Sequence, residues 1–149
     1  MEDQERVKVR ITQRHDYEFE NRFDGEVPEL VTDEPAPLGG GRGPAPVQLL
    51  AASVGNCLAA SLLFAIRKFK QDPGAVACEV TANVGRNQDK RLRVLSMLVQ
   101  LRLGVAGPQI EHLDRALAGF EEFCTVTASV RAAIPVSVEV FDGQGARLK

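Results

Sequence analysis

The stretch Pro46–Lys70, PVQLLAASVGNCLAASLLFAIRKFK, decides the fold of this 149-residue chain. It contains no proline after its first residue, and proline at that position suits the first turn of a helix. Lys68 and Lys70 suit the C-terminal end, where cations interact favourably with the helix dipole. Leu49–Ile66 is apolar on nearly every face. The stretch therefore predicts one long helix over 46–70, buried on all sides.

A membrane span is the competing interpretation of this stretch. The apolar run is at the lower length limit for a span, and Ser53, Gly55, Asn56 and Ser61 lie within it. We therefore expect the core helix of a soluble protein, with no membrane partner. A small protein can bury such a helix by dimerising, and this makes a homodimer the expected assembly.

The composition indicates one folded domain over 1–149. Hydrophobic residues make up 44% of the chain and charged residues 26%, which is enough for a packed core. The net charge of −2 and the scattered basic residues give no surface for a nucleic acid. The acidic segment Met1–Glu5 has no apolar stretch behind it, so it does not resemble a secretory signal. We expect a cytoplasmic protein.

Alternating apolar and polar residues predict strands on both sides of the helix. The N-terminal segment 1–34 contains one strand through 7–12, a hairpin turn at His15-Asp16, a second strand through 17–23 and a short third strand at Leu30-Val31. Segment 35–46 is rich in proline and glycine, which predicts a loop without regular structure.

The segment 75–149 is predicted to contain a hairpin, two helices and a last strand. The hairpin strands are 76–84 and 95–103. One helix starts after Gly107-Pro108 and ends close to Phe123-Cys124, a second covers 125–133, and the last strand covers 136–140. Antiparallel hairpins and helices in separate blocks are typical of an α+β fold.

The three cysteines are the remaining candidates for chemistry. The sequence has no phosphate-binding loop and no serine-hydrolase motif, and its cysteines form no CxxC pair that would suggest zinc. Cys57 lies within the predicted core helix, where a small buried apolar residue is the plain interpretation. Cys78 falls on the apolar face of a strand and is expected in the core. Cys124 precedes the 125–133 helix, whose free N–H groups and dipole favour a thiolate.

Two motifs resemble the OsmC and organic hydroperoxide resistance superfamily. They are PVQLLAASVGNCLA over 46–59 and FCTVTAS over 123–129, and they contain Cys57 and Cys124 in the family's order. The order of the predicted elements agrees as well. The resemblance implies an intertwined α+β homodimer with the cysteine-bearing helix buried at its centre.

The resemblance also implies a reaction. Cys57 matches the peroxidatic cysteine of the family, which reduces an organic hydroperoxide and becomes a sulfenic acid, and Cys124 matches the resolving cysteine, which then forms a disulfide with it. A lipoyl-type or small thiol reductant restores the pair. The implied function is oxidative stress defence, with no cofactor and no metal.

The family's peroxidases hold an arginine of the N-terminal strands against the reactive thiol. Arg14 is the best match for this arginine, with Arg22 and Arg42 as alternatives. Relatives anchor the arginine with a glutamate just before the central helix, where this chain has Val47 and Gln48. We therefore expect the arginine to lack its ion-pair anchor, although the amide oxygen of Gln48 could accept a hydrogen bond from it.

The expected substrate-binding residues around Cys57 are Gln48, Leu50 and Phe123, since the neighbourhood is rich in leucine and phenylalanine. Thr125 and Thr127 stand where relatives often have proline and serine. These departures imply a slow peroxidase or a different substrate.

Two alternatives remain open. One is a non-catalytic protein of the same fold, which binds a small apolar ligand in its pocket or uses the disulfide as a redox switch. The other is a soluble domain whose three cysteines are inert. Neither His15 nor His112 is assigned a catalytic role.

Overall fold

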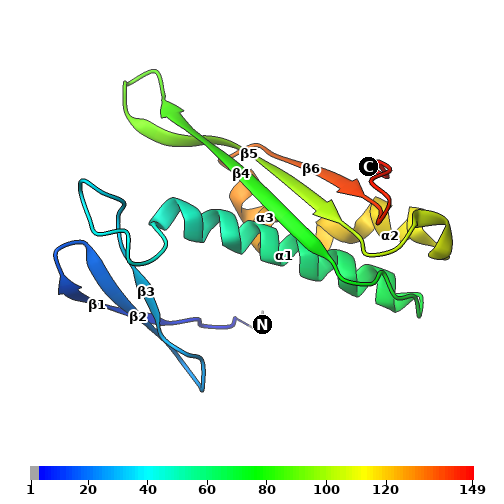
Figure 1. Cartoon of the computed structure of the whole chain (residues 1–149), viewed down its shortest axis with the longest axis horizontal. Coiled ribbons are helices and arrows are strands. Elements are labelled where there is room, and N and C mark those ends of the chain that lie inside the picture. Colours follow the sequence, from blue (N-terminus) through cyan, green and yellow to red (C-terminus); the bar gives the residue numbers. More distant parts are fainter. Residues whose placement is uncertain (1–3) are drawn as a thin grey trace. The chain divides into compact units, whose positions relative to one another are not determined.

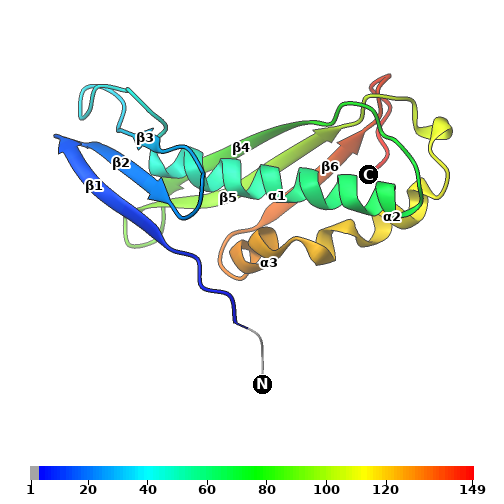
Figure 2. The same ribbon diagram turned by 90° about the horizontal axis from the view of Figure 1, so that it is seen from below.

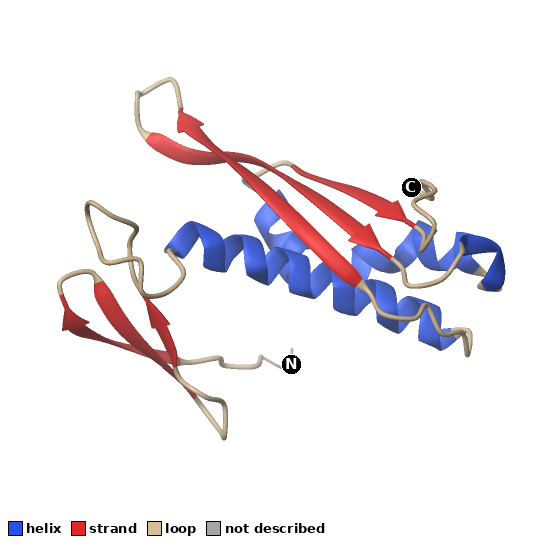
Figure 3. Cartoon of the chain, viewed as in Figure 1, coloured by secondary structure: helices blue, strands red, loops and turns tan. Residues whose placement is uncertain are grey.

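The computed structural model describes residues 4–149, which form two compact units divided between Leu49 and Leu50. The first unit contains a three-stranded sheet, and the second contains another three-stranded sheet and most of the helical residues. Figures 1 and 3 show these elements along the chain. The mixture of antiparallel strands and separate helices is α+β, as predicted. That one domain spans 1–149 stays a prediction.

The N-terminal unit is built on a three-stranded antiparallel sheet. Its strands β1 (Val9–His15), β2 (Glu18–Phe23) and β3 (Leu30–Thr32) are neighbours in that order. Val9 pairs with Phe23 and Ile11 with Asn21, so these side chains share one face of the sheet. Val9 is 41% exposed and Ile11 is 61% exposed, which leaves an apolar strip of this face uncovered within the described chain.

The loop 35–46 has no helix or strand before Pro46, as predicted, yet a buried carboxylate organises it. Asp33 accepts hydrogen bonds from the backbone N–H groups of Glu34 (2.8 Å), Gly40 (3.2 Å) and Arg42 (3.1 Å). These bonds, that from Arg42 first, hold the pKa of Asp33 below its ordinary value. The carboxylate thus fixes the loop that carries Arg42.

The second unit packs helices on one face of a second three-stranded sheet (Figures 1 and 2). Strands β4 (Ala77–Arg86) and β5 (Leu92–Arg102) are antiparallel, and β6 (Val136–Phe141) pairs with β5 in parallel. The helix α1 (Pro46–Lys68) lies along this sheet, and its first turn belongs to the N-terminal unit. The helical segments that complete the unit are η1 (Gly107–Gln109), α2 (Leu113–Gly119), η2 (Phe120–Phe123) and α3 (Thr125–Arg131).

One ridge of α1 forms the centre of the core. Val54, Leu58, Leu62 and Ile66 are at most 1% exposed and recur every four residues, which places them on one face of the helix. The expectation of burial on all sides is wrong for the single chain, because Phe64 on another face is 69% exposed. A helix that packs on one sheet covers only the face turned towards that sheet.

Two further expectations are corrected. The single helix expected after Gly107-Pro108 and up to Phe123-Cys124 is replaced by η1, α2 and η2, and the left-handed conformation of His112 (φ 60°) separates η1 from α2. Cys78 is exposed and not in the core, because β4 is an edge strand of its sheet.

The helix α1 is long and apolar enough to cross a membrane by length and composition alone. Its buried ridge packs with Met97, Val99 and Leu101 of β5 in one hydrophobic cluster. We therefore describe α1 as the core helix of a soluble fold.

Close approach of α1 to β4 depends on Gly55. A Cβ atom at this position would lie 2.7 Å from Cγ2 of Val80 and 3.2 Å from Sγ of Cys78. A carbon contact below 3.0 Å cannot be accommodated unless one of the elements shifts.

We predict that Gly55→Ala destabilises the protein by about 1–3 kcal/mol, because overpacking outweighs the gain in helix propensity. Thermal and urea unfolding measure the change. Gly119→Ala is the matched control, since a Cβ at Gly119 meets nothing within 4 Å and its φ is −119°. Equal stability of the two variants would contradict the close packing at Gly55.

We also predict a loss of stability in acid through Asp142. This buried carboxylate accepts backbone hydrogen bonds from Gly107, Gln144 and Ala146, each at 2.9 Å, and that from Gly107 is the first cause of its lowered pKa. Its contribution is present above the unfolded pKa, near 3.8, and is lost as the pH falls through the lower folded value. Denaturation curves should therefore separate wild type from Asp142→Asn at pH 7 more than at pH 3.

Candidate functional site

The structure brings the two cysteines of the sequence motifs together. Cys57 lies midway along α1 and is half-buried, whereas Cys124 lies between η2 and α3 and is fully buried. The Cys57 side chain lies close enough to the Cys124 thiol to affect its pKa. Two neighbouring thiols are the arrangement that a disulfide requires.

Local structure at the start of α3 sets the place of Cys124. Its extended backbone (φ −87°, ψ 93°) makes it the N-cap residue of α3, and its carbonyl accepts a hydrogen bond from the N–H of Ala128 (2.9 Å). The Cys124 thiol donates to Oγ1 of Thr127, also at 2.9 Å. This hydroxyl, in a fully buried residue, gives the thiol a polar partner inside the core.

The backbone N–H of Thr127 at the start of α3 favours a thiolate at Cys124, as expected, but its effect is smaller than that of burial. Burial raises the pKa of the Cys124 thiol, and contact with Cys57 raises it further, while the hydroxyl and backbone N–H of Thr127 act in the opposite direction. Burial outweighs the helix terminus because the side chain is removed from water altogether. Cys124 therefore remains protonated at neutral pH, and of the two thiols only Cys57 is partly open to solvent.

An apolar pocket of about 150 Å³ lies between α1 and the segment that ends at Cys124. Ser61, one helical turn after Cys57, lines it, and so does Phe123, the residue before Cys124. Phe64, Phe69 and Phe120 line it as well, with Lys68 and Arg115 at the charged positions. Phe123 thus lines an apolar pocket and is 73% exposed, and its role in substrate binding stays a prediction.

The other two expected substrate-binding residues lie in the first turns of α1. Leu50 is half-buried and packs against the hydrophobic core. The amide oxygen of Gln48 accepts a hydrogen bond from the backbone N–H of Ala45 (2.8 Å), as the third helical residue does in a capping box. Gln48 therefore stabilises the start of α1.

All three candidate arginines have carboxylate partners. Arg14 lies at a bulge where the pairing of β1 with β2 shifts, and its Nε is 3.9 Å from Glu18 and 4.0 Å from Glu20. Arg42 lies 3.4 Å from Glu18. Arg22 pairs with Glu20, and its hydrogen bond is the first cause of the lowered pKa of the Glu20 carboxyl. The expectation that the arginine lacks an ion-pair anchor is therefore wrong.

Glu18 and Glu20 were not predicted from the sequence, because the family resemblance points to a glutamate just before the central helix. The signal was present in the alternation of β2, where Glu18, Glu20 and Arg22 share one face. Glu18 also lines a second cavity, of about 320 Å³, with His15, Asp33 and Arg42.

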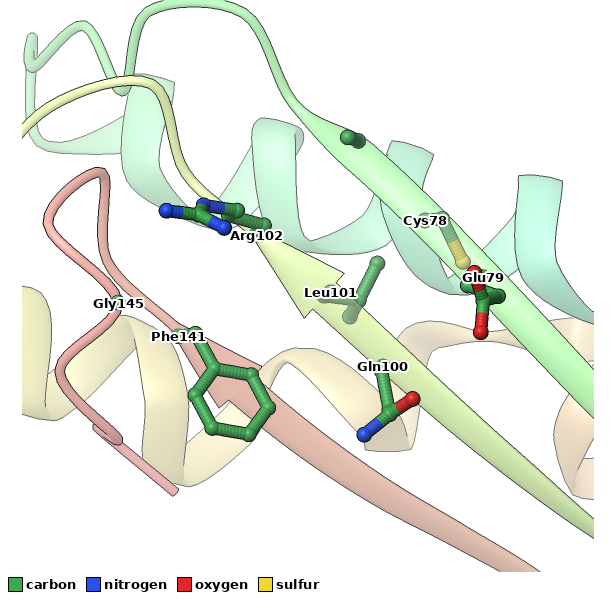
Figure 4. A pocket seen from close by; sticks show the side chains of 8 residues that line it. Cys78, Glu79, Gln100, Leu101, Arg102, Phe141 and Gly145 are labelled. Atoms are coloured by element: carbon green, nitrogen blue, oxygen red, sulfur yellow. The ribbon is translucent and has the colours of Figure 1, made fainter.

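A third hollow, of about 470 Å³, lies on the sheet of the second unit. Figure 4 shows Glu79, Gln100, Arg102 and Phe141 around it. Cys78 lines this hollow and does not line the apolar pocket of about 150 Å³. Within residues 4–149, no group of three or more His, Cys, Asp or Glu side chains could hold a metal ion.

Residues 39–139 match the family model of OsmC-like proteins. No curated protein sequence matches the chain.

Solved structures share the fold. An OsmC-like protein of unknown function from Vibrio cholerae has a TM-score of 0.78 at 15% identity, over 93% of this chain and 100% of its own. An organic hydroperoxide resistance protein from Elizabethkingia anophelis has a TM-score of 0.72 at 17% identity, over 94% of this chain and 98% of its own. The organic hydroperoxide resistance protein OhrB of Bacillus subtilis has a TM-score of 0.65 at 18% identity, over 89% of this chain and 97% of its own.

Proposed function

Because the chain belongs to the OsmC-like protein family, we propose that it is a thiol-dependent peroxidase that reduces organic hydroperoxides in oxidative stress defence. The observation that carries the proposal is the contact between Cys57 on α1 and Cys124 at the start of α3. Inert core cysteines need no such contact. The names of two neighbours of the same fold, both organic hydroperoxide resistance proteins, support the substrate class.

In the first step, the Cys57 thiolate attacks the terminal oxygen of the hydroperoxide. The O–O bond breaks, the sulfur becomes a sulfenic acid, and the departing alkoxide takes a proton to leave as an alcohol. Cys57 suits this role because it is the partly exposed member of the pair.

In the second step, Cys124 attacks the sulfur of the Cys57 sulfenic acid. An S–S bond forms, and hydroxide leaves with the proton of the Cys124 thiol as water. Because burial keeps Cys124 protonated until then, it does not compete for the hydroperoxide. A dithiol of the lipoyl type, or two molecules of a small thiol, then supplies two electrons and two protons, becomes a disulfide itself and returns both cysteines to thiols.

Arg14 is the proposed guanidinium that assists the reactive thiol. Glu18 and Glu20 supply the carboxylates beside it, a role that the family's glutamate before the helix would otherwise fill. The two carboxylates are largely shielded, at 13% and 17% exposed, whereas the Arg14 side chain is 45% exposed. The Arg14 side chain is thus paired with both carboxylates and still partly exposed.

We predict that Cys57→Ser lowers kcat/KM for cumene hydroperoxide, with dihydrolipoamide as the reductant, by at least about a thousandfold. Cys124→Ser should still react once per chain and accumulate the Cys57 sulfenic acid, because the resolving thiol is missing. A coupled assay with mass spectrometry of the cysteines measures both. Cys78→Ser is the control and should keep turnover. A wild-type protein without turnover and with unreactive Cys57 would contradict the proposal.

A non-catalytic role is the second candidate, favoured by the apolar pocket of about 150 Å³ and by the use of Gln48 as a helix cap. A redox switch would form the Cys57–Cys124 disulfide once and keep it, without dithiol-dependent turnover. The same assay separates the two functions, because only an enzyme consumes many equivalents of hydroperoxide per chain.

We further propose a cytoplasmic homodimer. The α1 face that carries Phe64 and the sheet face that carries Val9 and Ile11 expose large apolar side chains within the described chain. Apolar surface of this kind marks an interaction site. A second copy of the chain presents the same surfaces and can cover them.

Light scattering is expected to give twice the mass of one chain. Phe64→Glu should weaken the dimer by about tenfold or more, since a charge replaces an aromatic side chain in the buried surface. Leu92→Glu is the control, because Leu92 is similarly exposed, at 59%, but lies at the start of β5 and not on α1. A monomeric wild type at micromolar concentration would contradict the proposed assembly.

A further inference from the structure

Glu121, three residues before Cys124 in the sequence, connects η2 with the end of α3 and with Lys149. Its Oε1 accepts a hydrogen bond from Nη2 of Arg131 (2.5 Å), and its Oε2 lies 2.5 Å from Nζ of Lys149. Arg131 ends α3, Lys149 is the last residue of the sequence, and Glu121 itself lies in η2. Each carboxylate oxygen therefore holds a different cation from a different segment.

Both cations are fixed by further contacts. Arg131 also donates to the carbonyl of Val136 at the start of β6, from Nη2 at 3.0 Å and from Nε at 3.3 Å. Lys149 donates from Nζ to the carbonyl of Leu117 (2.9 Å) and lies 5.2 Å from the ring centre of Phe120. A carboxylate between two immobilised cations is itself immobilised.

The electrostatic environment keeps Glu121 charged. Burial alone would raise the pKa of this carboxyl, but the hydrogen bonds from Lys149 and Arg131 hold it below its ordinary value. The side chain is only 18% exposed, so solvent weakens these interactions less than it would at an open surface.

Glu121 is connected to Cys124 through the backbone. The N–H of Cys124 donates to the carbonyl of Glu121 (3.2 Å), and this bond closes η2 just before α3 begins. The side chain of Glu121 holds η2 from one side while its carbonyl holds the backbone of Cys124. Glu121 therefore links the backbone of Cys124 to Lys149 directly and to β6 through Arg131.

We propose that Glu121 is a positioning residue that holds Cys124 in register for attack on the oxidised Cys57. The inference rests on the proposed function. It concerns the second step alone, in which the sulfur of Cys124 must lie in line with the departing hydroxyl of the Cys57 sulfenic acid. Small errors of alignment slow such a reaction strongly, whereas Glu121 itself takes no part in the attack of Cys57 on the hydroperoxide.

The test compares Glu121→Gln with Glu139→Gln. Glu139 on β6 is the matched control, because it is 19% exposed and also contacts two side chains, Arg147 at 3.0 Å and Gln100 at 3.3 Å, but no part of η2. Two oxidants are used. Cumene hydroperoxide tests both steps, while diamide takes two electrons and two protons from the thiols and forms the disulfide without a sulfenic acid.

With cumene hydroperoxide, we expect Glu121→Gln to oxidise Cys57 at the rate of the control but to form the disulfide about tenfold more slowly. The sulfenic acid should accumulate and be trapped by dimedone. With diamide, disulfide formation should slow in the same variant. A merely destabilised protein would shift the melting temperature without this separation of the two steps.

Equal rates of disulfide formation in Glu121→Gln and Glu139→Gln would overturn the inference. If Glu121→Gln does not fold, Lys149→Ala removes one of the two cations and should slow the same step to a smaller extent. A wild type that forms the disulfide with diamide but resists the hydroperoxide would overturn the proposed function, and the diamide rates would then decide the role of Glu121 alone.

Discussion

The packing of one ridge of α1 on the sheet of the second unit is the constraint on which the rest of the structure depends. Burial of Val54, Leu58, Leu62 and Ile66 stabilises the fold by about 1.5–3 kcal/mol for each side chain. This ridge fixes the rotation of the helix about its axis, and Gly55 lets the helix approach β4 closely. The rotation in turn places Cys57 beside the ridge, half-buried and in reach of Cys124.

The same burial gives the two cysteines different environments. Cys124 is completely enclosed, so its thiol stays protonated in spite of the helix that begins behind it. Cys57 keeps access to solvent because only one face of α1 is covered. A pair with one reachable and one shielded sulfur suits an ordered sequence of attack and resolution. Interactions outside the pair, from Thr127 and the segment around Glu121, hold the shielded sulfur in place.

Several features could be predicted from the sequence because they depend on local pattern. The alternation of residues indicated five of the strands within a few positions, and the run after Pro46 indicated α1. The motifs around Cys57 and Cys124 singled out these two cysteines, although their contact is a property of two segments far apart in the chain. Exposure was harder to predict. Cys78 and Phe64 follow patterns of buried residues, but strand order and the number of packing partners decide burial.

The sequence by itself determined the α+β class, the long central helix and the motifs that contain Cys57 and Cys124, because propensity, spacing and motif act over short stretches. Only the tertiary structure decided the state of Cys124, since burial opposes the helix terminus and its size depends on the surrounding core. It also decided the partners of Arg14, Glu18 and Glu20, which a bulge and a strand pairing bring together. Charges and desolvation act through space, so the order of neighbours along the chain does not determine their balance.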